Sequence, residues 1–327
     1  MSGRIVAMGD GLWDLFPDGP RFGGATANYA CHASRLGADV HMVSGVGEDE
    51  RGEALLQVYR KHGVNTDLIQ VLKDYPTGVV HVELTENGLP TFTIGENAAW
   101  DHWEWNIEIE RMVRTADALY FGTLGQRGLS AREGIRRALE IAKAIKIPRI
   151  LDINLRTPFY DDILIRDSIA LCSVLKVSDE ELQRVCEACE IDSSQSVVNL
   201  LSEFRSRFGL DLVVMTRGAK GAMLIHSDGL VEHPGVPATV VDTVGAGDSF
   251  TASTTIGLLE GKEYAETLAD ACQVAAGVCS HAGAVPECVY LRLVSRLYFY
   301  QSSVRNGPAG RPSLLYRLAS AGFMVKA

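Results

Sequence analysis

The chain has 327 residues, of which 46% are hydrophobic and 22% charged, the balance of an ordinary globular protein. Its formal net charge of -10 argues against nucleic acid as a partner, because such binding depends on Lys and Arg neutralising phosphates. No stretch reaches the ~20 apolar residues of a membrane span, and the N-terminus lacks the basic-then-apolar order of a secretion signal. We therefore expect a cytoplasmic protein with no membrane partner.

The cysteines do not indicate a metal site or a disulfide framework. Seven are present, scattered along the chain. Cys186 and Cys189 form one Cys-x-x-Cys pair but lack the second pair, or the histidines, that a zinc site needs. We expect reduced and mostly structural cysteines.

Short β-rich runs alternate with helical patterns along most of the chain, which predicts an α/β fold with a mostly parallel sheet covered by helices. The predicted strands are Arg4 to Met8, Asp39 to Val46, Ala118 to Gly122, Arg149 to Ile153, Ser173 to Val177 and Asp211 to Thr216. The predicted helices, in which apolar residues recur at helical spacing, include Glu50 to His62, Ser130 to Ile145, Ser178 to Ala188 and Gln195 to Phe208.

One segment breaks this rhythm. Apolar and polar residues alternate from Val80 to Thr85 and again from Thr91 to Ile94, and Asn87-Gly88 between them offers a tight turn. The pattern predicts an antiparallel hairpin with one solvated face. Such a hairpin fits a lid, a dimer surface or an edge hairpin without a special role.

A glycine turn near the C-terminal end carries the clearest chemical pattern. Asp242-Thr243-Val244-Gly245-Ala246-Gly247-Asp248-Ser249-Phe250 follows a β-like run, Ala238 to Val241, and opens a helical pattern that continues to Leu259. Unpaired N–H groups and the helix dipole favour an anion at a helix start, and the two glycines let a ligand approach the backbone. Asp248 is then placed to accept a proton from a hydroxyl that attacks a phosphate. An Asp in a first helical turn is also favoured electrostatically without any catalytic role.

A second glycine-rich block lies near the N-terminus. Phe22-Gly23-Gly24-Ala25-Thr26-Ala27-Asn28 precedes a predicted helix of small residues ending at Leu36-Gly37, then a β run and the segment Gly45 to Gly52. Glycines here leave room for a ligand against bare backbone, and the Asn offers a donor and an acceptor to a hydroxyl. Taken alone, the block fits a glycine turn at the start of a helix better than a ligand site.

The two blocks, in this order, resemble those of the ribokinase family, also called the pfkB carbohydrate kinases, and most closely its fructokinase branch. The resemblance covers residues 4 to about 288. It implies a ribokinase-like three-layer α/β/α Rossmann-like sandwich with a mostly parallel sheet and a small β-sheet lid, made of strands from about 11–22 and 77–98. It also implies an ATP-dependent kinase that uses Mg²⁺, and K⁺ as a further cation, to phosphorylate a small sugar.

The resemblance assigns a role to each matching position. The implied catalytic residues are the base Asp248, the anion hole Gly245, Ala246 and Gly247, and the phosphate-facing Arg156 of Asp152-Ile153-Asn154-Leu155-Arg156. The implied sugar-binding residues are Asp14, Gly23, Gly24 and Asn28, and the implied nucleotide-binding residues are Asn154, Thr216, Gly218 and Gly221. Glu181 would organise Mg²⁺ through water, and Asp242 and Val244, with the loop 281–284, would hold K⁺ through carbonyl oxygens.

Several of these assignments have alternatives. Asp10 or Asp18 could take the role given to Asp14. Ser178 replaces the Asn of the family's Asn-x-x-Glu element, a departure seen in fructokinase-like members, and with Glu181 it also forms a plain capping box. The nucleotide-facing segment Thr216 to Gly221 is equally typical of a hairpin turn.

Two other function classes compete with a sugar kinase. Gly9-Asp10-Gly11 after a first strand invites a dinucleotide-dependent oxidoreductase, but Asp14 stands where the fingerprint needs its third glycine, and no P-loop pattern is present. A non-catalytic sugar or nucleoside sensor on the same fold is the second alternative, and the retention of Asp248 favours an enzyme. Among substrates, the blocks favour fructose over 2-keto-3-deoxygluconate, ribose and nucleosides.

No linker marks a boundary, so we predict a single kinase domain, 1–327, with a basic tail at 290–327. The tail has six Lys and Arg and no Asp or Glu, and its role is not assigned. A homodimer formed through the hairpin is the predicted assembly.

Overall fold

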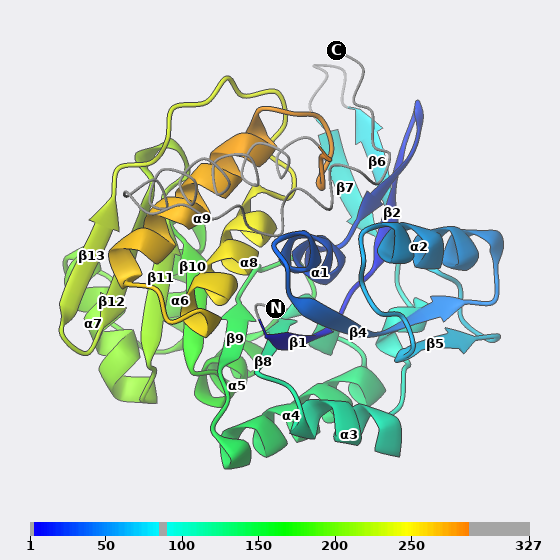
Figure 1. The fold of residues 1–327 in the computed structure, drawn as a ribbon, viewed down its shortest axis with the longest axis horizontal. Coiled ribbons are helices and arrows are strands. Elements are labelled where there is room, and N and C mark those ends of the chain that lie inside the picture. The colour runs from blue at the N-terminus through cyan, green and yellow to red at the C-terminus, as the bar shows by residue number, and fades with distance from the viewer. Residues whose placement is uncertain (1–2, 85–89, 288–327) are drawn as a thin grey trace, which may run out of the picture. The chain divides into compact units, whose positions relative to one another are not determined.

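In the computed structural model, which describes residues 3–84 and 90–287, nine strands form one large sheet (Figure 1). Their spatial order is β13 (Gly229–His233), β12 (Ala222–His226), β11 (Leu212–Thr216), β10 (Val174–Ser178), β9 (Arg149–Asp152), β8 (Ala118–Gly122), β1 (Arg4–Met8), β4 (Asp39–Gly47) and β5 (Ile69–Leu72). From β11 to β5 every neighbouring pair is parallel, whereas β12 and β13 at one edge are antiparallel. The predicted mostly parallel sheet is confirmed.

Helices cover both faces of this sheet, as a three-layer sandwich requires (Figure 1). One face carries α3 (Ile107–Arg114), α4 (Leu129–Ile145), α5 (Asp162–Leu171), α6 (Asp179–Ala188) and α7 (Val197–Phe208). The other carries α1 (Ala25–Arg35), α2 (Glu50–Lys61), α8 (Ala246–Leu259) and α9 (Tyr264–Cys279). None of these helices, within the described residues, is both long and apolar enough for a membrane span.

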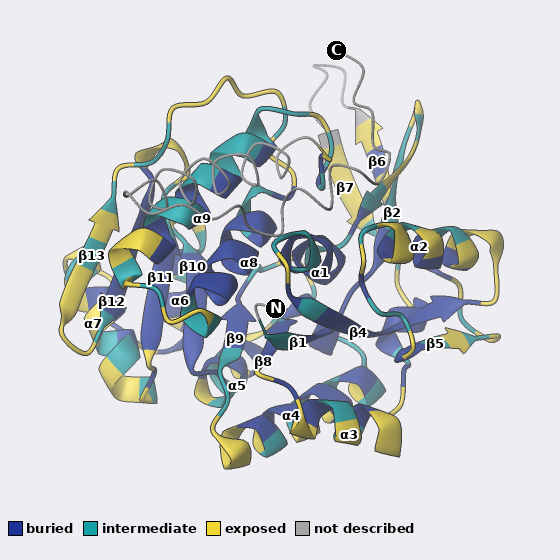
Figure 2. Cartoon of the chain, viewed as in Figure 1, coloured by how far each residue is buried: buried dark blue, intermediate teal, exposed yellow. Residues whose placement is uncertain are grey.

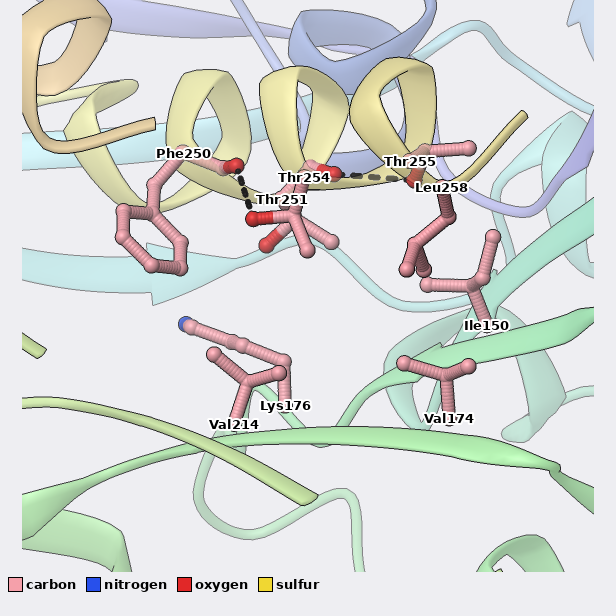
Figure 3. Close-up of a pocket in the computed structure, with 9 residues that line it drawn as sticks. All are labelled: Ile150, Val174, Lys176, Val214, Phe250, Thr251, Thr254, Thr255 and Leu258. Atoms are coloured by element: carbon pink, nitrogen blue, oxygen red, sulfur yellow. Dashed lines mark hydrogen bonds between the residues drawn. The ribbon is translucent and has the colours of Figure 1, made fainter. Parts of the chain in front are cut away.

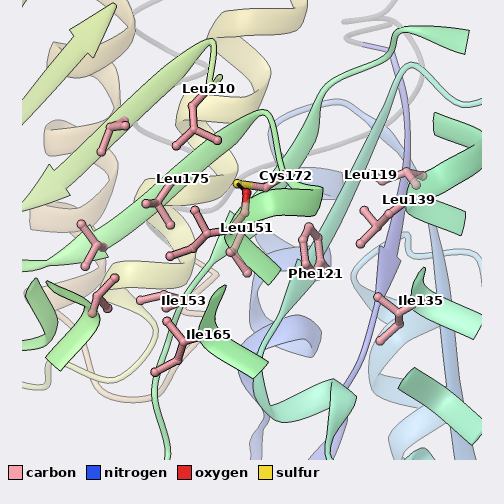
Figure 4. Packing of buried hydrophobic residues seen from close by; sticks show 14 of the residues in the cluster. Leu119, Phe121, Ile135, Leu139, Leu151, Ile153, Ile165, Cys172, Leu175 and Leu210 are labelled. Carbon is pink, nitrogen blue, oxygen red and sulfur yellow. Dashed lines mark hydrogen bonds between the residues drawn. The ribbon is translucent and has the colours of Figure 1, made fainter. Parts of the chain in front are cut away.

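The central strands are buried on both faces, which explains their nearly continuous apolar sequences (Figure 2). Alternate residues of a strand point to opposite faces, so Val6 and Met8 of β1 pack in one cluster while Ile5 and Ala7 pack in the other. Figure 4 shows the first cluster, in which Phe121, Leu151 and Ile165 are among the residues that fill the space between sheet and helices. Within the described residues, those up to Pro286 form one compact unit.

A four-stranded small sheet stands apart from the large one. Its order is β3 (Gly19–Gly23), β2 (Leu12–Phe16), β6 (Gly78–Leu84) and β7 (Pro90–Ile94). The antiparallel pairing of β6 and β7 confirms the predicted hairpin, while its turn, Asn87-Gly88, lies outside the described residues. The register pairs Asp14 with Val80 and Val80 with Ile94, so these three residues share one face of the small sheet.

The prediction of a strand at Ala238 to Val241 is wrong. This stretch has no strand partner among the described residues and runs as an irregular connection into α8. Val240 and Val241 are 65% and 61% exposed, and the amide of Val241 donates instead to the carbonyl of Cys279 at the end of α9 (2.8 Å). A β-branched sequence alone therefore did not indicate sheet pairing, because β propensity depends on packing.

The carboxylate of Asp49 joins the large sheet to the small one. Asp49 is the N-cap of α2 and accepts from the amide of Gly52 (2.7 Å). It also accepts from the amide and the hydroxyl of Thr77, which precedes β6 (2.9 and 2.7 Å). One side chain therefore fixes both the start of α2 and the base of the hairpin.

We expect Asp49→Ala to lower the free energy of unfolding by about 1–2 kcal/mol, because α2 loses its cap and Thr77 loses two bonds. Urea unfolding followed by circular dichroism measures the change. Glu48→Ala, at the exposed neighbouring position, is the matched control and should stay within about 0.5 kcal/mol of the parent. Equal losses for the two variants would contradict this role of Asp49.

Candidate active site

Asp248 lies in the first turn of α8. Its side chain is almost completely buried, with 9% of the residue exposed, and Asn28 Nδ2 of α1 donates to Asp248 Oδ2 (2.9 Å). The Oδ1 atom of Asn28 is also buried and has no hydrogen-bond partner in the described chain. A buried amide oxygen without a donor is a place where a ligand hydroxyl can donate.

The charges around Asp248 shift its proton affinity towards neutral pH. Burial, followed by the negative charge of Asp152, raises the pKa of Asp248 to about 7. The hydrogen bond from Asn28 and the positive charges of Lys176 and Arg156 act in the opposite direction. A carboxyl group with a pKa near 7 is suited to accept a proton in general base catalysis.

The backbone at the start of α8 leaves amides open. Gly245, the N-cap, has φ +79°, and its carbonyl accepts the first helical bond from Ser249 (2.9 Å). The amides of Gly247 and Asp248 have no acceptor among the described residues, which is the arrangement that binds anions. The predicted anion hole needs one correction, because the amide of Ala246 donates to the carbonyl of Thr243 (3.3 Å).

Asp14 lies on β2. The positive charge of Arg156 acts on the carboxylates of both Asp14 and Asp248. Burial, then the charge of Asp10, raises the pKa of Asp14 to about 6, and the charges of Arg156 and Arg21 lower it. Arg156 also lowers the pKa of Asp248, so one positive charge acts on both Asp14 and Asp248. Its only described hydrogen bond goes to the carbonyl of Leu155 (3.1 Å), so its donors remain available.

The two alternatives to Asp14 have structural partners. Asp10 accepts from the amide of Ala25 (2.7 Å) and the hydroxyl of Thr26 (2.8 Å), and so caps α1. Asp18 forms an exposed ion pair with Arg21 (2.9 Å). Their carboxylates therefore have structural tasks.

At Gly23 and Gly24, other protein atoms occupy the position that a Cβ would take. A Cβ at Gly23 would lie 2.3 Å from Asp14 Oδ2, so this glycine admits the Asp14 carboxylate. Gly24 has φ +101°, and a Cβ there would lie 3.0 Å from the carbonyl of Asp10. The glycines thus shape the site by letting β2, β3 and α1 meet, and a direct contact with sugar stays a prediction.

Glu181 fixes the loop that carries Asn154 and Arg156. Its Oε2 accepts from the amide of Ser178 (2.9 Å) in the predicted capping box, which the structure confirms. Its Oε1 accepts from the amide of Leu155 (2.8 Å). The loop after β9 is therefore tied to the start of α6, and Asn154 within it has a left-handed backbone, with φ +38°.

The predicted nucleotide-facing turn connects β11 and β12 as a hairpin. Thr216 pairs in register with Ser178 on β10, so it lies at the same edge of the sheet as the Glu181 cap. Gly221 has φ +79°, and a Cβ there would lie 2.0 Å from the carbonyl of His233, whereas Gly218 borders open space. No described hydrogen bond joins this turn to Asp248, and its nucleotide role stays a prediction.

The carboxylate of Asp242 holds two loops together. Its oxygens accept from the amides of Val244 and Gly283 (3.0 Å each). Ala284, in the second loop, accepts at its carbonyl from His32 Nε2 (2.9 Å). The predicted cation residues Asp242 and Val244 are thus brought beside the loop 281–284.

Sequence reasoning assigned no role to two buried charges and a buried histidine. Lys176 Nζ and Asp152 Oδ1 form an ion pair (3.0 Å) below α8. The available signal was a Lys between Leu175 and Val177 in a predicted strand, where a charge needs a partner. Nothing in the small-residue pattern of α1 pointed to the contact between His32 and Ala284.

The close approach at Gly245 is testable by substitution. A Cβ at Gly245 would lie 2.2 Å from the carbonyl of Ala284, in addition to the positive φ. We expect Gly245→Ala to cost about 2–4 kcal/mol of unfolding free energy in urea. Gly261→Ala, after the other end of α8, has φ +66° with nothing nearby, and should cost about 1–2 kcal/mol. Similar losses at both positions would show that the contact with Ala284 is unimportant.

Comparisons with known proteins agree with this geometry. Residues 19–289 match the model of the pfkB family carbohydrate kinases. Aminoimidazole riboside kinase of Salmonella typhimurium is 30% identical over 261 residues, 76% of this chain and 78% of that protein. Fructokinase of Klebsiella pneumoniae is 28% identical, over 79% of this chain and 85% of the fructokinase chain. The crystal structure of fructokinase with bound ATP from Xylella fastidiosa shares the fold, with a TM-score of 0.78 at 21% identity over 90% of this chain and 99% of that one. The chain therefore belongs to the pfkB family of carbohydrate kinases, phosphotransferases with a hydroxyl group as acceptor.

Proposed function

We propose that this chain transfers the γ-phosphate of ATP to a hydroxyl of a small sugar, with Asp248 as the catalytic base. The observation that carries the proposal is a buried carboxylate next to two open amides, those of Gly247 and Asp248, at the start of α8. An amide that points at a phosphate and a base that points at a hydroxyl are the two groups that phosphoryl transfer requires. Their adjacency supports a kinase over a sensor.

Each remaining group supplies positioning or charge. Asn28 orients the Asp248 carboxylate through Nδ2 and offers its free Oδ1 to the sugar. Asp14, on β2, accepts from sugar hydroxyls when ionised. The positive charge of Arg156 acts on both carboxylates, and its planar fork is suited to the transferring phosphate. Asp248 then takes the proton as the oxygen attacks phosphorus.

The residues fit Mg²⁺ held mainly by phosphates and water. In the described chain no group of three or more His, Cys, Asp or Glu side chains could hold a metal. Glu181 retains acceptor capacity at Oε1, which accepts one bond from Leu155, so it can orient a hydrated ion. When bound, Mg²⁺ neutralises charge on the phosphates. The two loops joined by Asp242 fit a K⁺ site built from carbonyl oxygens.

The substrate proposal favours fructose, with a riboside as the rival. Ser178 before Glu181 and the Asp-x-Asn-x-Arg segment at 152–156 are the features that favour fructose. The similarity to an aminoimidazole riboside kinase is the observation that favours a nucleoside-like acceptor. 2-Keto-3-deoxygluconate and ribose are less favoured candidate substrates.

The small sheet is proposed as a lid over the sugar, since Asp14 shares its face with Val80 and Ile94. Closure of such a sheet excludes water that would otherwise hydrolyse ATP.

A homodimer through the hairpin is the proposed assembly. Phe92 on β7 is 55% exposed, and the dimer contact would cover this apolar side chain.

We expect Asp248→Asn to lower kcat by at least ~100-fold while ATP still binds, because the base is lost but the amides remain. In the parent, kcat/KM should fall tenfold per pH unit below about 7, where Asp248 becomes protonated. Coupled ADP release measures kcat and kcat/KM, and calorimetric titration with ATP measures binding. Glu108→Gln, the same acid-to-amide change in the first turn of α3, is the control. Near-normal turnover of Asp248→Asn would refute the assignment.

A panel of acceptors identifies the substrate. We expect ADP release to be fastest with fructose, compared with ribose, 2-keto-3-deoxygluconate, aminoimidazole riboside and common nucleosides, each at the same concentration. The ratio of kcat/KM values decides between them. Preference for a riboside would replace fructose, and the absence of turnover with every acceptor, in protein that binds ATP, would favour the sensor.

A further inference from the structure

A buried lysine lies beneath the proposed base. Lys176 of β10 is 8% exposed and sits between Leu175 and Val177, which face the opposite layer. The alternation of a strand turns Lys176, like Val174, towards α8. Figure 3 shows its side chain between the sheet and the residues of α8.

The ammonium group is anchored in a chain of contacts from the sheet to the first turn of α8. Lys176 Nζ lies 3.0 Å from Asp152 Oδ1. Thr251 Oγ1 of α8 lies 3.0 Å from the other oxygen of Asp152 and 3.0 Å from the carbonyl of Gly247. A Cβ at Gly247 would lie 3.4 Å from Lys176 Nζ, so the charge lies close to the proposed anion site.

This lysine stays charged although it is buried. Burial acts to lower the pKa of Lys176, but the carboxylates of Asp152, Glu181 and Asp248 raise it above its ordinary value. The groups that face Asp248 are Asp152 from β9, Lys176 from β10, Arg156 from the following loop, Asn28 from α1 and the buried Tyr120 of β8. Asp152 and Lys176 therefore act on Asp248 in opposite directions.

We propose that Lys176 is a further positioning residue of the transfer site, whose ammonium group, anchored by Asp152, holds the first turn of α8 and keeps the Asp248 carboxylate ionised. The idea rests on the proposed function of Asp248. A structural ion pair alone would not explain the placement, because buried pairs can often be replaced by apolar residues without loss of stability. Here the positive charge lies between the strand ends and the open amides.

Substitution of either partner should move the titration of Asp248 in opposite directions. Lys176→Met removes the charge, and Met can pack against the apolar lining of the adjacent cavity of about 10 Å³, which includes Val174, Val214 and Phe250 (Figure 3). Asp152→Asn keeps the shape and leaves Lys176. Carboxyl ¹³C resonances of labelled Asp follow the titration, with Asp248 assigned by its absence from Asp248→Asn.

We expect the Asp248 midpoint to rise by about one pH unit or more in Lys176→Met and to fall in Asp152→Asn. At pH 6, kcat of Lys176→Met should fall about tenfold with KM values within about threefold, and higher pH should restore part of the loss. Lys143→Met, at an exposed position on α4, should leave the midpoint and kcat unchanged.

The double variant, with both charges removed, covers the case in which Lys176→Met does not fold. Its Asp248 midpoint should return towards the parent value, because two opposing effects are removed. An unchanged midpoint in Lys176→Met, shifts of the same sign in the two single variants, or a loss of kcat that pH does not relieve would overturn the proposal. Midpoints that shift as expected in a protein without kinase activity would uphold the coupling and overturn the proposed function instead.

Discussion

The candidate site depends on one constraint, which is that the Asp248 carboxylate, the proposed base, is almost completely buried. Burial and the neighbouring Asp152 favour its protonated form. Asn28, Lys176 and Arg156 oppose that effect from three different elements. The balance leaves Asp248 with a pKa near neutrality, where a carboxyl group exchanges its proton readily at physiological pH.

The parallel sheet makes this balance possible. Asp152 and Lys176 are register partners on β9 and β10, and Ser178 and Thr216 are partners on β10 and β11. The carboxyl ends of parallel strands meet at one edge, so residues far apart in the chain converge there. The open start of α8 adds the dipole and the unpaired amides at the same place.

Much of the frame was predictable because local patterns and tertiary packing agree in it. The strands Arg4–Met8 and Ala118–Gly122 are observed with the predicted bounds, since fully buried strands have short apolar sequences. The run Ala238 to Val241 is also short and mostly apolar, but it pairs with no strand of the described chain and remains exposed. Pairing depends on residues distant in sequence, and composition does not reveal it.

The sequence predicted which residues belong to the candidate site better than it predicted the contacts among them. Asp248 and Asn28, which a family resemblance singled out, are joined by a hydrogen bond. The space at Gly23, in contrast, accommodates the Asp14 carboxylate, because the hairpin of β2 and β3 brings the two together. Lys176 escaped notice since its partner, Asp152, is contributed by another strand.

A crystal structure with the preferred sugar and a non-hydrolysable ATP analogue would show whether Asp248 can act as the base. We expect an acceptor hydroxyl to lie ~2.6–3.2 Å from a carboxylate oxygen of Asp248, with the terminal phosphate at the amide of Gly247. A sugar bound with every hydroxyl out of reach of Asp248, or a terminal phosphate held away from the start of α8, would contradict it.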